Sequence, residues 1–490
     1  MQKSELRRII ISQQAFFQKH PTLIPRDQEI DYFLKDSEVV MICGIRGCGK
    51  TSFLKQIADR LDGIKVYINF EAIGPEDFEP RNFQDIRDIA AELYGSSGKE
   101  LDKKEIEEGG EKQVYYFLEE IQHIPLWESW LNKLYEQGIK VFVTGSNSKF
   151  LNSGNGLFLT GRNRLLRLFP FSFKEYLRLK GIEMSDPDLG FLPTSRKDEI
   201  LSHFLKYFDK GGFPQVLKNE KFELSREYFE EILRKEILSR HEITDAEGLR
   251  RLVVFLFSNV ASEYSFETLK KVSGIESEET VQRYLGHLEE AFLLYRVPML
   301  NHSQDKADTQ DKADNRNGNR DGNENGTAAS CKAYAGDTGF FKTVATNYPD
   351  SLGLRFENLV FLELLRRGKE VFFFRDSREC DFVVKGEGRQ GQEISGAIQV
   401  STYFGNPAVR EREVEGMLGA MQEFGLEEGL ILTLDYEEVL MLDDGEILTL
   451  DYEEVLKPGD EDIQETNVRS RAGEKGKIIV VKPVWKWLLE

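Results

Sequence analysis

A glycine-rich run between an apolar strand and a helix constrains this chain more than any other feature of its sequence. The run is GIRGCGKTS, residues 44–52, and it matches the pattern G-x-x-x-x-G-K-[S/T]. The apolar segment VVMIC (39–43) precedes it, and an amphipathic helical pattern follows it. In this context the backbone N–H groups of such a loop point inward at phosphate oxygens. The run therefore predicts a nucleotide phosphate site at the end of a strand.

Lys50 and Thr51, near the end of the run, are expected to have separate roles. Lys50 is expected to bridge the β- and γ-phosphates, and the Thr51 hydroxyl is expected to hold Mg²⁺. The predicted phosphate-binding residues are Gly44, Ile45, Arg46, Gly47, Cys48, Gly49, Lys50, Thr51 and Ser52. The alternative is a glycine-rich turn before an ordinary helix.

Two adjacent glutamates follow the strand-like segment VYYFL (114–118). A phosphate site of this kind needs an acid that holds the Mg²⁺ shell and a base that orients the attacking water. Glu119 falls in the metal position, where Asp is the usual residue, and Glu120 falls in the base position. A solvated pair of acids at a strand end is the alternative.

Two further residues are candidate catalytic groups. The segment VTGSNSKF places Ser146 and Asn147 at the end of the next strand, where a polar group could sense the γ-phosphate. Arg162 follows a glycine in a locally basic segment and is a candidate arginine finger. By spacing alone, a surface arginine explains Arg162 equally well.

The order of elements predicts how the chain is organised. Strand-like and helix-like segments alternate from residue 37 to 185, which predicts a parallel sheet with helices on its faces. Residues 190–300 are expected to be almost all helical. Residues 301–330 contain no large apolar side chain and are predicted to be a disordered insert. The expected strands are 39–43, 65–70, 114–118, 140–144 and 164–169.

Composition narrows the class of protein. A net charge of −20 argues against a chain that coats nucleic acid. No apolar run is long enough for a membrane helix, and the start lacks a signal-peptide pattern. The four cysteines show no metal-type spacing and fit reduced thiols, so we expect a cytoplasmic protein without a membrane partner.

Several motifs together resemble a known family. With GIRGCGKTS they are FLEEIQHIPLWESWLNKLYEQGIKVFVTGSN, LTGR, PFSFKEYL and GGFPQVL, and the chain resembles uncharacterised archaeal and bacterial AAA-type P-loop ATPases. The resemblance spans nearly the whole chain apart from the insert and a repeat, ILTLDYEEVL, at 431–440 and 447–456. It implies that Lys50 and Thr51 form the Walker A pair, that Glu119 and Glu120 are the Walker B acids, and that Arg162 belongs to a Gly-Arg motif. It also implies ATP as the nucleotide.

The resemblance implies three parts. The expected fold is an α/β P-loop NTPase with an AAA-type parallel sheet, then a mostly helical winged-helix region, then a second α/β domain like a restriction endonuclease. The expected ranges are 1–220 for the ATPase domain with a helical extension, 221–345 for the winged-helix region with the insert 301–330, and 346–490 for the nuclease-like domain.

The winged-helix region has a candidate recognition helix that begins near Ser277. If this helix entered a major groove, the reading residues would be Thr280, Gln282, Arg283 and His287. However, the region has slightly more acidic than basic residues, whereas a DNA-binding surface is normally basic. A winged helix that contacts protein is therefore an equal alternative.

The nuclease-like domain lacks half of the expected site. Glu357 and Asp381 match the helix and strand acids of a restriction-endonuclease core, but Gln399 and Ser401 stand where Glu and Lys belong. A neutral amide is a poor Mg²⁺ ligand, and a serine cannot neutralise charge on a phosphate. We expect a structural or nucleic-acid-docking domain rather than an active nuclease.

The predicted function is Mg²⁺-dependent hydrolysis of ATP at the β–γ bond, used as a conformational motor or switch. The expected partners are ATP and either double-stranded DNA or a protein client, and a homo-oligomer is left open. Two alternatives remain. One is a non-hydrolysing, nucleotide-dependent binding module or DNA-binding regulator, and the other is an ATP-dependent DNA-processing nuclease.

Overall fold

The computed structural model describes most of the chain. The described residues are 1–19, 22–34, 38–74, 76–94, 113–148, 162–184, 192–300, 330–345, 352–388, 391–443, 446–450 and 476–490. The predicted insert 301–330 lies outside them, apart from Ser330, and so does residue 451 onward of the second repeat copy.

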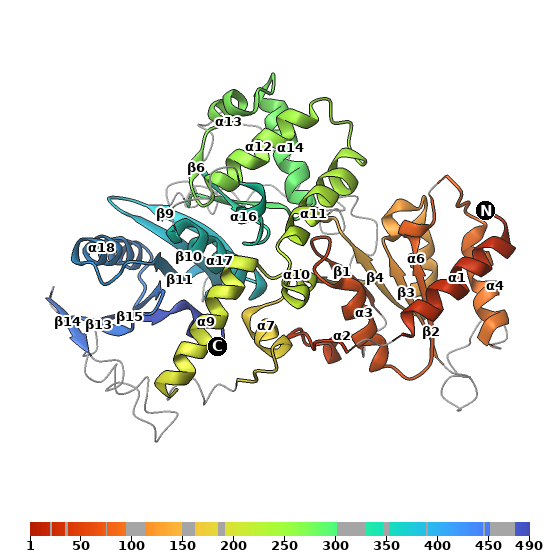
Figure 1. Ribbon diagram of the computed structural model, residues 1–490, viewed down its shortest axis with the longest axis horizontal. Coiled ribbons are helices and arrows are strands. Elements are labelled where there is room, and N and C mark those ends of the chain that lie inside the picture. Colours follow the sequence, from red (N-terminus) through yellow and green to blue (C-terminus); the bar gives the residue numbers. More distant parts are fainter. Residues whose placement is uncertain are drawn as a thin grey trace.

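A five-stranded parallel sheet forms the first part of the molecule, red to orange in Figure 1. Its strand order is β2-β3-β4-β1-β5, and two of its three interior strands, β1 and β4, are buried at every residue, as expected where helices cover both faces. The five predicted strands are confirmed to within two residues at each end. They are β1 (Val39–Cys43), β2 (Ile64–Asn69), β3 (Val114–Glu119), β4 (Lys140–Gly145) and β5 (Asn163–Arg167).

Alternate residues of each strand point to opposite faces, and helices cover both. Val39 and Met41 pack with α1 (Lys3–Phe17), α4 (Asn82–Tyr94) and α6 (Trp127–Glu136). Val40 and Ile42 pack with α3 (Lys50–Asp59) and with helices of the middle region, which runs from α7 (Phe173–Leu179) to α16 (Phe340–Val344). Short elements complete this part: α2 (Asp31–Leu34), η1 (Phe70–Ala72) and η2 (Ile121–His123).

The middle region is mostly helical and shares an apolar core with one face of the parallel sheet. It carries a small antiparallel sheet, β6 (Glu263–Tyr264), β8 (Cys331–Ala335) and β7 (Leu294–Pro298). Its helices are α7 (Phe173–Leu179), α9 (Thr194–Lys210), α10 (Pro214–Asn219), α11 (Glu223–Glu231), the π-helix η4 (Ile232–Leu238), α12 (Ala246–Ser258), α13 (Phe266–Ser273), α14 (Glu278–Glu290) and α16 (Phe340–Val344).

The candidate recognition helix begins where the sequence predicts. Ser277 is the N-cap of α14, and its side chain accepts a hydrogen bond from the Thr280 N–H at 3.1 Å. Gln282 and Arg283 are exposed, but His287 is half-buried and its ring stacks on His241 with centroids 3.6 Å apart. The role of His287 in reading DNA stays a prediction, and so does the winged helix itself.

A second, seven-stranded mixed sheet forms the last part, cyan to blue in Figure 1. Its order is β14-β13-β15-β12-β11-β10-β9, and α17 (Leu352–Arg366) covers one face while α18 (Pro407–Glu423) covers the other. The remaining elements are β9 (Glu370–Arg375), β10 (Glu379–Gly388), β11 (Gly391–Ser401), β12 (Glu428–Thr433), β13 (Glu438–Asp443), β14 (Glu446–Leu450), β15 (Lys477–Pro483) and α21 (Val484–Trp487). A second α/β part is thus present, and its likeness to nucleases stays a prediction.

Among the described residues, no helix combines the length and the apolar character needed to cross a membrane. The four cysteines are free thiols, and Cys43, Cys48 and Cys380 are buried. The cytoplasmic location stays a prediction.

Candidate functional site

The glycine-rich loop joins the end of β1 to the start of α3, as the sequence predicts. Gly49 is the N-cap of α3 with φ 103°, a backbone conformation that favours glycine. A Cβ atom on Gly44 would lie 2.0 Å from the backbone oxygen of Leu168, so a side chain has no room there. The loop is therefore fixed by its glycines in a tight curve at the N-terminus of a helix.

Lys50 folds back over this loop. Its Nζ donates hydrogen bonds to the Gly44 and Ile45 carbonyl oxygens at 2.8 and 3.4 Å, and the side chain is buried. These carbonyls are weaker acceptors than phosphate oxygens, which form charge-assisted bonds with an ammonium group. The lysine thus stands where phosphate would replace its present partners.

Residues outside the loop hold it in shape. The guanidinium of Arg26 donates to the Cys48 carbonyl at 3.0 Å and to Glu175 Oε1 at 2.8 Å. Glu175 belongs to the capping box of α7, which explains the segment PFSFKEYL. Burial raises the pKa of the Cys48 thiol, so Cys48 is a packing residue whose part in the loop is its backbone.

Glu119 is buried at the end of β3, beside the start of α3. The Tyr67 hydroxyl donates to its Oε2 at 2.8 Å, whereas Oε1 has no donor with hydrogen-bond geometry among the described residues. Burial raises the pKa of Glu119, while the nearby hydroxyls of Thr51 and Tyr67 lower it. An orphaned buried carboxylate oxygen beside a threonine hydroxyl is a donor set that fits Mg²⁺.

Glu120 leaves the strand and turns its side chain toward β4. Its backbone is left-handed (φ 53°), a costly conformation for a residue other than glycine that is found mostly at functional sites. Its Oε2 accepts hydrogen bonds from Gln122 Nε2 at 2.6 Å and from the Ser146 hydroxyl at 3.0 Å. The two glutamates therefore occupy different environments, as their separate predicted roles require.

A charged network that the sequence did not reveal lies over this site. Arg240, just beyond η4, donates to the Ser146 hydroxyl at 3.4 Å, and its Nη2 lies 3.8 Å from Glu120 Oε2. The same nitrogen is 2.6 Å from Oε2 of the buried Glu236, whose other oxygen is 3.3 Å from Arg46 of the loop. Burial raises the pKa of Glu236, and the neighbouring Arg240 opposes that shift.

This network joins the glycine-rich loop to the middle region through two arginines and one acid. Arg46 also pairs with Glu71 and Glu231 at 2.9 and 3.1 Å, so its side chain faces these acids rather than the loop interior. The signal that could have found Glu236 and Arg240 is their i,i+4 spacing in the helical segment ILRKEILSR.

The two remaining candidate residues lie in different places. Asn147 is buried directly after β4, next to Ser146, and it is Ser146 that contacts Glu120. Arg162 lies at the start of β5, where its backbone oxygen accepts a hydrogen bond from the N–H of Val39 at the start of β1. That is the sheet end opposite the loop, and Arg162 Nη1 lies 3.8 Å from Glu136. The structure thus does not bring Arg162 to the phosphate site of its own chain, and this corrects its assignment as a catalytic residue there.

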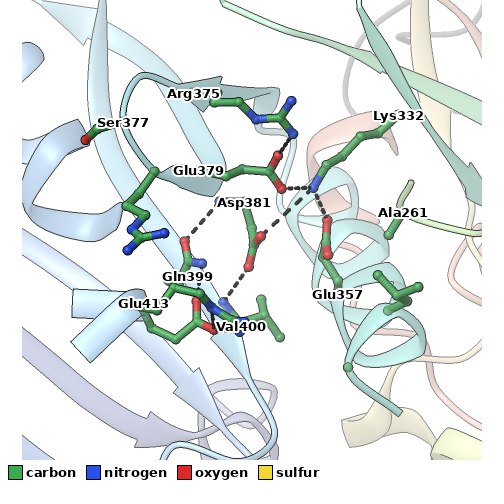
Figure 2. A pocket seen from close by; sticks show the side chains of 14 residues that line it. Ala261, Lys332, Glu357, Arg375, Ser377, Glu379, Asp381, Gln399, Val400 and Glu413 are labelled. Atoms are coloured by element: carbon green, nitrogen blue, oxygen red, sulfur yellow. Dashed lines mark hydrogen bonds and ion pairs between the residues drawn. The ribbon is translucent and has the colours of Figure 1, made fainter. Parts of the chain in front are cut away.

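A second polar site is a cavity of about 470 Å³ in the last part of the chain. Figure 2 shows Lys332 of β8 pointing at the acids that the sequence compares with a nuclease core. Its Nζ lies 2.9 Å from Glu357, 2.7 Å from Glu379 and 4.0 Å from Asp381. Gln399 Oε1 accepts the Asp381 N–H at 3.0 Å, and Gln399 also bonds to Glu413.

The Lys332 ammonium is the cation closest to the two acids Glu357 and Asp381, while Arg375, Arg378 and Arg412 also line the cavity. Burial lowers the pKa of Lys332, but Glu357, Asp381 and Glu379 outweigh that effect and raise it, so the amine stays charged. Burial and the neighbouring Glu357 raise the pKa of Asp381 well above its usual value. The Lys332 ammonium would compete with a divalent ion for these acids, and the expected lack of nuclease chemistry stays a prediction.

Comparison with known proteins supports the assignment of the first part. Residues 36–177 match the family model described as an AAA domain. The first part of this chain is therefore similar to an AAA domain. Its parallel sheet, glycine-rich loop and paired acids all fall in the matched range, and residues 201–314 match a domain of unknown function. The winged-helix and nuclease-like parts of the resemblance stay predictions.

Relatives of this chain occur in archaea and bacteria. A protein of Methanocaldococcus jannaschii, described as uncharacterised, is 28% identical over 96% of this chain and 92% of its own length. An uncharacterised protein of Haemophilus influenzae is 26% identical over 73% of this chain and 82% of its own. The Holliday junction branch migration motor RuvB of Thermotoga maritima superposes with a TM-score of 0.27 and 14% identity, over 57% of this chain and 92% of that one, too loosely to support an argument.

Proposed function

We propose that this chain is a Mg²⁺-dependent ATPase that cleaves the β–γ bond of ATP and acts as a conformational motor or switch on double-stranded DNA or a protein client. The observation that carries the proposal is the convergence of Lys50, Glu119 and Glu120 at the carboxyl ends of β1 and β3. This set holds a phosphate-binding amine, a metal-binding acid and a second acid in a different environment.

The side chains have separate roles in the proposed reaction. Lys50 and the loop N–H groups bind the phosphates, and Thr51 and Glu119 would hold Mg²⁺, which supplies charge neutralisation when bound. All hydrogen bonds that the described residues give to the Glu120 carboxyl go to Oε2. Its Oε1 is thus the oxygen that can accept the proton of the attacking water. Asn147, beside Ser146, is proposed to sense the γ-phosphate.

The network of Arg46, Glu236 and Arg240 is the proposed link to conformational change. Arg240 and Glu236 belong to the middle region, whereas Glu120 and Ser146 belong to the AAA domain. Negative charge arriving at the loop would attract Arg46 and Arg240 and compete with Glu236 for them. A shift of the middle region against the AAA domain would follow.

One observation favours a non-hydrolysing switch as the second candidate function. Glu120 lies beside Arg240 and accepts hydrogen bonds from Gln122 and Ser146, so its carboxylate already has partners other than an attacking water. In that case the chain binds ATP and changes conformation without turnover.

A turnover assay on the full chain separates these functions. ATP hydrolysis with Mg²⁺ that stops with a chelator supports the ATPase, and stimulation by double-stranded DNA identifies DNA as the client. Tight ATP binding without turnover, with and without DNA, supports the switch. Absence of ATP binding rejects both.

Arg240→Ala is expected to lower the turnover number about tenfold to hundredfold, because one positioned donor at a charged reaction centre contributes that much or more. ATP affinity is expected to change less. Steady-state kinetics check this, with Arg234→Ala as the matched control, since Arg234 is an exposed arginine on the π-helix that precedes Arg240. Equal rates for Arg240→Ala and wild type would remove Arg240 from the site.

Asp381→Ala is expected to leave ATPase turnover unchanged and to have no effect on DNA integrity, because Lys332 already occupies the acid cluster of the last part. Incubation of wild type and variant with linear and circular DNA in Mg²⁺ or Mn²⁺ tests this. Cleavage by wild type that vanishes in the variant would instead establish the nuclease alternative.

A further inference from the structure

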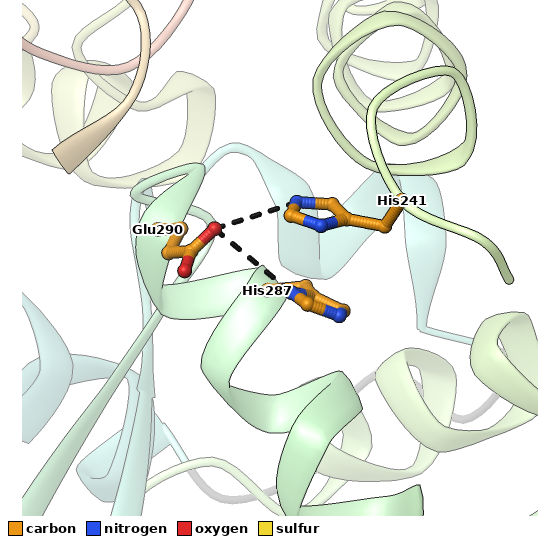
Figure 3. A group of neighbouring side chains, drawn as sticks. All are labelled: His241, His287 and Glu290. Atoms are coloured by element: carbon orange, nitrogen blue, oxygen red, sulfur yellow. Dashed lines mark ion pairs between the residues drawn. The ribbon is translucent and has the colours of Figure 1, made fainter. Parts of the chain in front are cut away.

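Three metal-ligating side chains meet between the middle region's helices, away from the phosphate loop. His241 lies in the turn after η4, and His287 and Glu290 lie on α14 (Figure 3). The i,i+3 spacing of His287 and Glu290 puts both on one face of that helix. Figure 3 shows both imidazoles turned toward one oxygen of Glu290.

The distances within this cluster are those of a small coordination shell. His241 Nε2 lies 3.4 Å from Glu290 Oε2, and His287 Nδ1 lies 3.9 Å from the same oxygen. One ligand atom from each residue falls within 4.8 Å of the others. Two ligands about 2.1 Å from a Zn²⁺ ion at a tetrahedral angle stand about 3.4 Å apart, which matches the separation of His241 Nε2 and Glu290 Oε2.

The charges also suit a transition-metal ion. The two imidazole rings stack with centroids 3.6 Å apart, a spacing at which two imidazolium cations would repel each other. Neutral imidazoles are ligands for Zn²⁺, and the carboxylate contributes the negative charge. The three side chains are 10%, 16% and 27% exposed, so the cluster is partly shielded but reachable by an ion.

We propose that His241, His287 and Glu290 bind one divalent transition-metal ion of the Zn²⁺ class, with water as the fourth ligand. Among the described residues, no other His, Cys, Asp or Glu joins this group. Binding needs the two rings to tilt out of their stack, because the nitrogen lone pairs lie in the ring planes.

The position of this site gives the ion a structural consequence. His241 directly follows Arg240, which reaches Ser146 and Glu120 in the AAA domain. An ion shared by His241 and α14 would fix the turn that carries Arg240 to the candidate recognition helix. This consequence rests on the proposed function, whereas the metal site itself does not.

The test uses the full chain, stripped with a chelator, free of nucleotide and kept in excess Mg²⁺ so that hard-metal sites are filled. Titration with Co²⁺ as a spectroscopic probe, followed by Zn²⁺ competition against a chromophoric chelator, measures stoichiometry and affinity. The expected result is one equivalent of Co²⁺ with the visible bands of a four-coordinate ion, displaced by Zn²⁺.

Ligand variants decide where that ion sits. His287→Asn and Glu290→Gln are each expected to weaken Zn²⁺ binding by more than about a hundredfold, since loss of even a supporting residue at a metal site costs tenfold to a hundredfold. His203→Asn is the matched control, because His203 lies on α9 and contacts Tyr176 instead. Its Zn²⁺ affinity should equal that of wild type.

Two results would overturn the proposal. One is wild type that takes up no Co²⁺ or Zn²⁺ at micromolar concentrations, which would leave the cluster as ordinary ion pairs. The other is wild-type affinity in both ligand variants, which would place the ion elsewhere. If one ligand variant fails to fold, the other still locates the ion, and Zn²⁺ bound only to the folded chain must raise the melting temperature of wild type.

Discussion

Lys50→Ala is expected to weaken ATP binding by at least about a hundredfold, because it removes the charge-assisted hydrogen bonds that an ammonium makes to phosphate, each contributing about 1.5–3 kcal/mol. The effect should be large because Lys50 is buried at the loop, where its Nζ now holds the Gly44 and Ile45 carbonyls. Calorimetry or a fluorescent ATP analogue measures the change.

A matched control for this variant lies on the same helix. Lys55 is also buried, and its Nζ contacts the carbonyl oxygens of Phe16 and Lys19 rather than the loop. Lys55→Met should keep ATP affinity even where it lowers the melting temperature. Unchanged ATP affinity in Lys50→Ala would show that this loop does not hold phosphate.

Glu120→Gln is expected to lower turnover by about a hundredfold or more while Mg-ATP binding survives, since a positioned base contributes about 10²–10⁴. The amide keeps the size of the side chain but cannot accept the water's proton. Its oxygen can still accept the hydrogen bond from the Ser146 hydroxyl, so the left-handed turn at Glu120 should be kept. Single-turnover kinetics with a separate binding measurement distinguish chemistry from affinity.

Glu119→Gln provides the contrast, because it removes charge from the predicted Mg²⁺ shell. The Mg²⁺ concentration for half-maximal rate should rise, and the Tyr67 hydroxyl can still donate to the new amide oxygen. Normal turnover in Glu120→Gln together with a dead Glu119→Gln that still binds metal would reverse the two roles. The proposed base would then be Glu119.

The fold of the first part of the chain could be predicted from the sequence because short, contiguous segments determine it. The loop needs a glycine at position 49, where φ is positive, and a lysine directly after it. The five residues of β1 precede the loop. An apolar run such as VYYFL can only be a buried strand in that context, so the two glutamates had to emerge at its end. The start of α14 was equally local, because Ser277 caps the N–H three residues on.

The tertiary structure alone decided which distant residues complete each site. Arg240 lies 120 residues beyond Glu120 in the sequence, and Lys332 lies outside the segment of the acids it neutralises. Arg162 is part of the family-like motif LTGR, yet the pairing of β5 with β1 puts it at the end of the sheet opposite the glycine-rich loop. His287 belongs to a helix face that periodicity leaves ambiguous, and only packing against His241 shows where it points. Local patterns specify backbone conformation, whereas contacts between segments depend on how the whole chain buries its apolar faces.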